Sequence, residues 1–248
     1  MATFDEFITS LREEFGEQVA GKKFEIFCKW FLENDPEWSK TIDRVWLWDD
    51  YPNKWQTEDF GTDLVFKDMA GLIWAVQAKC YSDHRSTTKG DMNSFLADTG
   101  RPEVDRRLWM QTTDKMGSAA KKTCKGQDKP VTILNLNYFK SAQIAYPSSF
   151  DELYRAKIKD KPRPDPHQIE AIEAVQFKLN SLDRGQMIMA CGTGKTFTTL
   201  WIKEALNAQT TLVLLPSLSL LSQTMREWAW AGNSDFEILN VCSDKSVG

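Results

Sequence analysis

Apolar and polar positions follow two different periodicities along this chain. From residue 62 to residue 79 they alternate on either side of a turn at residues 68–71, a pattern that predicts a β-hairpin. Further on, short apolar runs at residues 187–189 and 211–215 enclose a segment at 197–208 whose apolar positions have helical spacing. Short apolar runs of this kind are typical of buried parallel strands, so the second pattern predicts a strand–helix–strand unit.

Four other segments extend this mixed pattern. Residues 21–32 read as an amphipathic helix that opens at Gly21, and residues 107–113 read as a strand with a helix after it. A helix is expected at residues 169–179, after a proline-rich stretch, and residues 236–241 read as one more strand. Strands and helices therefore alternate along most of the chain, which predicts an α/β fold.

A glycine-rich turn connects the first strand and the helix of the strand–helix–strand unit. Gly192 and Gly194 allow backbone N–H groups to point inward at an anion, and a helix that starts near Lys195 directs its positive end at the same place. We expect Lys195 to contact the β- and γ-phosphates of a nucleotide and Thr196 to contact Mg²⁺. The residues expected to bind the nucleotide here are Cys191, Gly192, Thr193, Gly194, Lys195 and Thr196.

The stretch from Met189 to Thr196 resembles motif I of the superfamily 2 helicases. It departs from the general phosphate-loop pattern at Met189, where that pattern has Gly. The alternative is a chance Gly-Thr-Gly-Lys-Thr sequence in an ordinary loop. In the helicases, a Gln in the position of Gln168 reads the adenine edge, and the resemblance implies that Arg163 and His167 pack beside it. A plain helix start after Pro-Asp-Pro would also explain this segment.

Residues 216–224 resemble motif Ia of the same helicases, in which polar groups at the end of a strand touch the backbone of a nucleic acid strand. A simpler interpretation is that Ser217 or Ser219 is the N-cap of a helix. The two interpretations are compatible, because hydroxyl and N–H groups at a helix start also suit a phosphate.

Three polar side chains are expected to meet at one end of the hairpin. Gln77 and Lys79 are two residues apart and point to one face of their strand, and Asp63 lies across the hairpin. This Asp…Gln-x-Lys arrangement resembles the PD-(D/E)xK nuclease core of the Mrr-like branch. The alternative is an ordinary hairpin with a polar face.

The nuclease resemblance implies a role for each residue. Asp63 would ligate Mg²⁺, Gln77 would ligate or orient the metal together with the carbonyl of Ala78, and Lys79 would polarise the attacking water. Oxygen ligands suit a hard cation, which stabilises charge on the phosphodiester. A Glu at the place of Glu25 can reach the metal in such enzymes, although a solvated helix carboxylate would explain Glu25 equally well. A nuclease fold that has lost its activity is a separate possibility.

The predicted fold is a restriction-endonuclease-like (Mrr-type) α/β/α nuclease domain followed by a partial RecA-like parallel-sheet ATPase lobe. We assign residues 1–146 to the nuclease domain, residues 147–165 to a charged, proline-rich linker and residues 166–248 to the ATPase lobe. A Walker B strand, motif III and a second lobe with arginine fingers are not recognisable in the sequence. We therefore expect this lobe to be incomplete and the chain to be part of a larger polypeptide.

Composition adds few constraints. The formal net charge is −4 and the pI is about 5.4, so contacts with nucleic acid would need local basic patches, such as Lys121, Lys122, Lys125 and Lys129. Five cysteines without a CxxC pair favour neither a zinc site nor a disulfide framework. No signal peptide or long apolar run is present, which favours a cytoplasmic protein without a membrane partner.

The order of nuclease and motor resembles the single-polypeptide type I (type ISP) restriction enzymes. The resemblance implies Mg²⁺-dependent DNA cleavage coupled to ATP-driven translocation on double-stranded DNA. It also implies further motor, methyltransferase and target-recognition domains in the same polypeptide. A type I motor subunit, another phage-defence nuclease–helicase, and a DNA translocase with an inactive nuclease-like domain are the alternatives.

Overall fold

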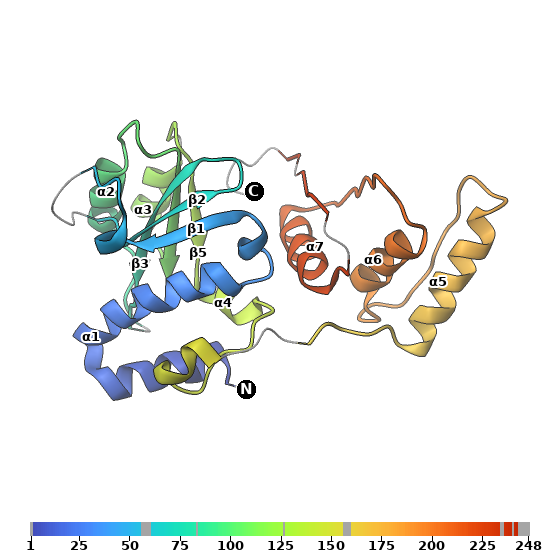
Figure 1. The fold of residues 1–248 in the computed structure, drawn as a ribbon, viewed down its shortest axis with the longest axis horizontal. Helices are drawn as coiled ribbons and strands as arrows, with labels where there is room; N and C mark the ends of the chain where they lie inside the picture. The colour runs from blue at the N-terminus through green and yellow to red at the C-terminus, as the bar shows by residue number, and fades with distance from the viewer. Residues whose placement is uncertain are drawn as a thin grey trace. The chain divides into compact units, whose positions relative to one another are not determined.

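In the computed structural model the chain forms two compact units, residues 1–159 and 160–247 (Figure 1). The structure describes residues 2–55, 61–82, 84–125, 127–155, 160–233, 236–239 and 241–242. Part of the predicted linker, residues 156–159, and Asn240 in the predicted strand at 236–241 lie outside the described residues.

A long helix, α1 (Phe4–Asn34), opens the first unit. It begins with a capping box, in which the Thr3 hydroxyl accepts a hydrogen bond from the backbone of Glu6 and the Glu6 carboxylate accepts one from the backbone of Thr3. Gly16 interrupts it with φ 72° and ψ 161°, so α1 consists of two helical pieces. The predicted helix start at Gly21 is therefore wrong, because the capping signal lies at Thr3 and Gly21 is inside the second piece.

A five-stranded sheet forms the centre of the first unit, with the strands in the order β1-β2-β3-β4-β5. Strands β1, β2 and β3 are antiparallel neighbours, and β4 and β5 continue the sheet in parallel. Their bounds are β1 Ile42–Leu47, β2 Leu64–Asp68, β3 Ile73–Lys79, β4 Arg106–Gln111 and β5 Val131–Leu134. The predicted hairpin is β2 and β3, and the strand predicted at residues 107–113 is β4.

Helices cover both faces of this sheet (Figure 1). The larger core joins α1 to one face through residues such as Phe24, Phe66 and Val76. The smaller core joins α2 to the other face through Phe95, Ala75 and Trp109. The remaining helical bounds in this unit are α2 Lys89–Asp98, α3 Ser118–Cys124, α4 Leu136–Ser141, and the 3₁₀ helices Trp38–Lys40, Trp48–Asp50 and Phe150–Arg155. This arrangement confirms the predicted α/β/α layers.

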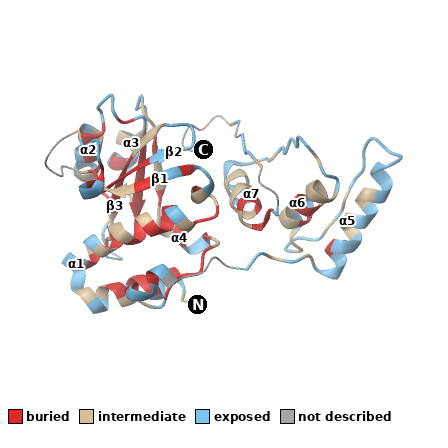
Figure 2. Ribbon diagram, viewed as in Figure 1, coloured by how far each residue is buried: buried red, intermediate tan, exposed pale blue. Residues whose placement is uncertain are grey.

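The second unit contains three helices in its described part, α5 (Pro166–Leu179), α6 (Lys195–Ala205) and α7 (Leu218–Ala231). The helices predicted at 169–179 and 197–208 are thus α5 and α6. Burial is sparse: Figure 2 shows exposed positions along most of this unit and a continuous buried core in the first. A small core forms where Leu200 of α6 packs with Trp228 and Ala231 of α7.

The strands predicted at residues 187–189 and 211–215 do not form in the second unit, and the described residues of 236–241 are not a strand either. Ile188 is 85% exposed, and Leu212 and Leu214 are each 83% exposed. A parallel strand needs ladder partners and cover on both faces. No strand among the described residues of this unit supplies them, so the predicted parallel sheet is absent there although the apolar pattern is present.

None of the helices built by the described residues is long and apolar enough to span a membrane.

Candidate functional site

Asp63 and Gln77 form the centre of the predicted nuclease site. Asp63 directly precedes β2, and its backbone N–H bonds the carbonyl of Val76 at 2.8 Å, which places it opposite the end of β3. Its Oδ2 accepts a hydrogen bond from Gln77 Nε2 and a second from the backbone N–H of Ala78 at 2.7 Å. Asp63 and Gln77 are only 7% and 3% exposed. The structure therefore brings these two predicted residues into direct contact.

The residues before Asp63 are also held in place. Thr62 is buried, and its hydroxyl donates to Oδ2 of the buried Asp98 at 2.6 Å. The backbone of Gly61 lies against the Gln77 side chain, so that a Cβ at this position would be 3.3 Å from Gln77 Oε1. Gln77 thus points its amide nitrogen at Asp63 and its amide oxygen towards Gly61.

Lys79, the third predicted residue, lies at the last position of β3 and is partly exposed. It pairs with Gln111 of β4, and its carbonyl accepts a hydrogen bond from the backbone N–H of Thr112 at 3.1 Å. Strand alternation puts Lys79 on the same face as Gln77, as predicted. The backbone of Lys79 is therefore fixed by the neighbouring strand.

Glu25, the fourth predicted residue, lies on α1. Its carboxylate makes an ion pair with Lys22 at 3.1 Å and is 16% exposed. Burial raises the pKa of the Cys28 thiol well above its usual value, and the negative charges of Asp63, Cys80 and Glu25 raise it further. The predicted contact between Glu25 and a metal remains a prediction.

The donor set around Asp63 is suited to a hard cation. Asp63 supplies one carboxylate, and Gln77 and Ala78 can supply an amide and a carbonyl oxygen, all of them oxygen ligands. The described residues hold no cluster of three His, Cys, Asp or Glu side chains that could bind a metal. Gln77 now donates to Asp63 through Nε2, so its amide must turn to offer Oε1. The residues fit a weakly charged Mg²⁺ site that keeps several waters.

Replacing Gln77 by Glu tests this arrangement. We expect Gln77→Glu to bind Mn²⁺ at least as tightly as the wild type, because a second carboxylate replaces a neutral ligand. We also expect the metal-free variant to unfold at a lower temperature, because Glu cannot donate to Asp63 and the two buried carboxylates repel each other. Isothermal titration with Mn²⁺ and thermal unfolding with EDTA measure the two effects. Weaker Mn²⁺ binding in a folded Gln77→Glu variant would show that the amide itself is required.

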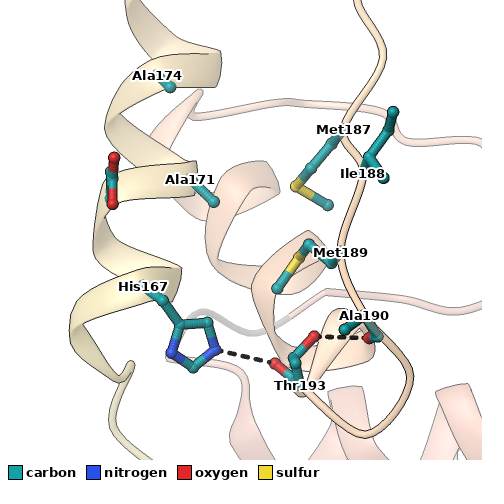
Figure 3. A pocket seen from close by; sticks show the side chains of 9 residues that line it. His167, Ala171, Ala174, Met187, Ile188, Met189, Ala190 and Thr193 are labelled. Carbon is teal, nitrogen blue, oxygen red and sulfur yellow. Dashed lines mark hydrogen bonds between the residues drawn. The ribbon is translucent and has the colours of Figure 1, made fainter.

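The glycine-rich turn in the second unit has the backbone of an anion-binding loop. Gly192 and Gly194 have φ of 78° and 73°, and α6 begins at Lys195, directly after them. Lys195 Nζ donates to the carbonyls of Ala190 and Met189 at 2.7 and 3.1 Å. The Thr193 hydroxyl donates to the carbonyl of Ala190 at 2.8 Å (Figure 3). The Lys195 ammonium thus occupies the turn, where phosphate oxygens would replace the carbonyls as acceptors.

Gln168 holds this turn from α5. Its Oε1 accepts from the backbone N–H of Asp165 at 2.8 Å, and its Nε2 donates to the carbonyls of Thr193 and Gly194 at 3.0 and 3.4 Å. Gln168 is 4% exposed, so its amide is fully engaged in the protein. The predicted contact with adenine is not tested by this arrangement. The structure instead shows Gln168 bonding both the start of α5 and the turn.

The other residues predicted to contact the nucleotide are held by fewer interactions than Gln168. His167 Nε2 lies 3.3 Å from the Thr193 carbonyl, and Figure 3 shows the imidazole at the edge of an open groove. Residues of α5 and of the segment 187–190 line that groove. Arg163 and Cys191 are exposed, and Thr196 lies in the first turn of α6. The turn and Gln168 therefore come together as predicted, whereas Arg163 has no defined place in the site.

Gly194 is the glycine of this turn at which an added Cβ would be most crowded. A Cβ at Gly194 would lie 2.4 Å from Gln168 Nε2, and the backbone φ of 73° is unfavourable for other residues. We expect Gly194→Ala to lower the unfolding free energy by about 1–3 kcal/mol and to abolish binding of a fluorescent ATP analogue. Gly185→Ala is the matched control, because nothing lies within 4 Å of its added Cβ. Unchanged nucleotide binding in Gly194→Ala would contradict the assignment of the turn.

Ser217 has the simpler of its two predicted roles. It is the N-cap of α7, and its hydroxyl accepts a hydrogen bond from the backbone N–H of Leu220 at 3.3 Å. Ser219 lies inside α7, and its hydroxyl is 3.2 Å from that of Ser217. A contact with nucleic acid at this helix start stays a prediction.

Sequence reasoning missed a buried polar network beside Lys79. Gln111 is 1% exposed; its Oε1 accepts from the Thr87 hydroxyl and from Trp109 Nε1, and its Nε2 donates to the Thr113 carbonyl at 2.6 Å. These bonds tie the segment before α2 to the segment after β4. The one signal in the sequence was a Gln at the end of an apolar strand. That signal does not indicate which residues bond the Gln111 side chain.

The comparisons with known proteins divide the chain in the same way as this geometry. Residues 33–154 match a family model described as restriction endonuclease, and residues 161–246 match one described as type III restriction enzyme, res subunit. The chain joins a restriction-endonuclease domain to a helicase-like region. The residues that match the restriction-endonuclease model include Asp63, Gln77 and Lys79. The residues that match the other model include the turn at Lys195.

Among solved structures, the chain is similar to the ATP-dependent type ISP restriction-modification enzyme LlaBIII bound to DNA. The identity is 28% and the TM-score 0.76, over 92% of this chain and 15% of that one. This match confirms the predicted resemblance to the type ISP enzymes, and it includes both the nuclease domain and the helicase-like region. The chain spans about 15% of the length of that enzyme.

Two further structures have weaker similarity to the chain. They are the DNA modification-dependent restriction endonuclease AspBHI, with a TM-score of 0.38, and the MspJI restriction endonuclease in complex with a 27-mer oligonucleotide, with a TM-score of 0.34. Each is 12% identical to this chain, and each match extends over 56% of this chain. The matched part is 36% of the AspBHI chain and 33% of the MspJI chain. Similarity at this level supports no argument about the nuclease domain. A search of the curated proteins found no match.

Proposed function

We propose that this chain hydrolyses DNA phosphodiesters in a Mg²⁺-dependent reaction, and that in the full-length protein this cleavage is coupled to ATP-driven translocation on double-stranded DNA. The observation that carries the proposal is the contact between Asp63 and Gln77 at the end of the sheet, beside Lys79. The similar type ISP enzyme is described as ATP-dependent and bound to DNA. The ATP dependence and the bound DNA of that enzyme support a role for ATP and for DNA in this chain as well.

Each residue of the nuclease site has a proposed task. Asp63, the amide oxygen of Gln77 and the carbonyl of Ala78 would hold Mg²⁺, which supplies charge stabilisation to the phosphodiester when it is bound. Lys79 lies at the exposed end of β3, from which its ammonium group can orient and polarise the water that attacks phosphorus. Glu25 is proposed to approach the metal from α1. The buried position of Asp63 and Gln77 keeps bulk water away from these ligands.

The helicase-like region would bind ATP at the turn that begins at Cys191. Gly192, Gly194 and the start of α6 offer backbone N–H groups to phosphate oxygens, and Lys195 supplies the positive charge. Thr196 would contact the Mg²⁺ of the nucleotide. Gln168, with His167 and Arg163 before it, would border the adenine.

We further propose that this chain acts together with additional motor, methyltransferase and target-recognition domains of one polypeptide, in the cytoplasm. The support is its similarity to a type ISP enzyme of which it spans 15%. A type I motor subunit or another phage-defence nuclease–helicase would use the same two sites.

Incubation of the chain with supercoiled plasmid and Mg²⁺ or Mn²⁺ tests the nuclease proposal directly. Conversion to nicked or linear DNA that depends on the metal and is stopped by EDTA is the expected result. Intact plasmid, from a folded chain that binds both Mn²⁺ and DNA, would instead identify a translocase with an inactive nuclease-like domain.

A further inference from the structure

Arg12 contacts the ends of β3 and β4 although it lies far from both in the sequence. It is located in the first helical piece of α1, and its Nη2 donates hydrogen bonds to the carbonyl of Tyr81 and, at 3.4 Å, to the hydroxyl of Thr112. The Thr112 hydroxyl also donates to the Tyr81 carbonyl at 2.8 Å. The guanidinium, the hydroxyl and the carbonyl thus form a closed group at the edge of the sheet that carries the nuclease site.

This group is bonded on to the backbone of Lys79. The N–H of Thr112 donates to the Lys79 carbonyl at 3.1 Å, and the Tyr81 carbonyl lies two residues further along the same segment. The segment 79–81 is therefore bonded at both of its ends to Thr112, the residue that follows β4. Arg12 bonds the Tyr81 carbonyl and the Thr112 hydroxyl, so it holds the segment that leaves Lys79.

The bend at Gly16 gives Arg12 this position. Figure 1 shows the two helical pieces of α1 meeting at a sharp bend. Gly16 has φ 72° and ψ 161°, a conformation that essentially only glycine adopts, and a Cβ there would meet nothing within 4 Å. Glycine is thus needed at position 16 for its backbone conformation, and not because a side chain would lack space there. A continuous helix would carry residues 4–15 in another direction.

Packing of the first helical piece does not depend on Arg12. Phe7 and Leu11 are fully buried, and Phe4 stacks on Phe139 with ring centroids 4.7 Å apart. These contacts anchor the piece on the larger core. The charged, partly buried guanidinium adds directed hydrogen bonds to Tyr81 and Thr112, which follow the ends of β3 and β4.

We propose that Arg12 is a positioning residue of the nuclease site, which holds the segment 79–81 against β4 and so keeps Lys79 in place for the attack on DNA. Arg12 precedes the part of the chain that matches the endonuclease family, residues 33–154. The proposal rests on the proposed nuclease function. It assigns the site a contribution from the piece of α1 before Gly16.

The test compares Arg12→Met with Arg106→Met, which replaces an arginine at the opposite end of β4. We expect Arg12→Met to lower the single-turnover rate of plasmid cleavage in Mn²⁺ by about 10–100-fold. DNA affinity, measured by fluorescence anisotropy, should stay within about twofold. The affinity for Mn²⁺ should fall by a smaller factor than the cleavage rate, because Arg12 bonds Tyr81 and Thr112, which are not among the proposed metal ligands. Guanidinium, added below the concentration that affects unfolding, should restore part of the rate only in Arg12→Met.

Three outcomes would overturn the proposal. They are an Arg12→Met rate equal to that of the wild type, an equal loss in Arg106→Met, and a loss of DNA affinity that accounts for the whole effect. If Arg12→Met does not fold, Arg12→Lys decides, with an expected rate between those of the wild type and a Lys79→Ala variant. A wild-type chain that binds Mn²⁺ but does not cleave would instead refute the nuclease function itself.

Discussion

We expect Asp63→Ala and Lys79→Ala each to abolish DNA cleavage in the full-length protein, while the proposed ATPase activity and translocation persist. Asp63 is the only carboxylate in the proposed Asp63–Gln77–Ala78 ligand set, and Lys79 is the proposed partner of the attacking water. Loss of one such charge-stabilising group lowers a rate by at least about 10²–10³-fold. The motor should be unaffected, because the phosphate-binding turn lies in the other compact unit.

The matched controls for these variants are Asp43→Ala and Lys67→Ala. These residues form an exposed ion pair of 3.7 Å between β1 and β2, and exposed pairs contribute little to stability. Plasmid cleavage, ATP hydrolysis and triplex displacement, which reports translocation, should all be normal in the controls. An equal loss of ATPase in Asp63→Ala and Lys79→Ala would argue against two separate sites. Normal cleavage in either variant would remove its residue from the mechanism.

The second large effect concerns the motor. We expect Lys195→Ala to eliminate ATP-driven translocation, and with it any cleavage that depends on translocation. Lys195 Nζ is the side-chain cation that the structure places inside the turn. Backbone N–H groups can bind a phosphate but cannot neutralise the charge that develops on the transferred group.

ATP hydrolysis and triplex displacement measure this effect, with Lys178→Ala as the control. Lys178 is an exposed residue in the last turn of α5, in the same unit. Metal-dependent nicking that needs no ATP should remain in Lys195→Ala, because Asp63 and its neighbours are unchanged. ATP-driven translocation at the wild-type rate in Lys195→Ala would exclude the turn as the nucleotide site.

Local features could be predicted from the sequence because neighbouring residues determine them. The alternation between residues 62 and 79 identified the β2–β3 hairpin. It also set Gln77 and Lys79 on one face, since residues two apart in a strand share a side. The turn at Gly192 and Gly194 was recognisable because the backbone there has positive φ, which glycine adopts without strain. The strands predicted from the apolar runs at 187–189 and 211–215 are wrong for this structure, because a sequence pattern cannot supply the ladder partners that a strand needs.

Tertiary structure alone decided how distant segments complete the sites. Arg12 meets Tyr81 and Thr112 across separations of 69 and 100 residues, and Gln168 bonds a turn 25 residues away. Such contacts depend on the bend at Gly16 and on the packing of α5 against the turn, and they leave no periodic signal along the chain. The sequence by itself determined which chemical groups the two sites contain. Folding determined which buried partners orient those groups, because hydrogen-bond geometry is set only when the packed elements meet.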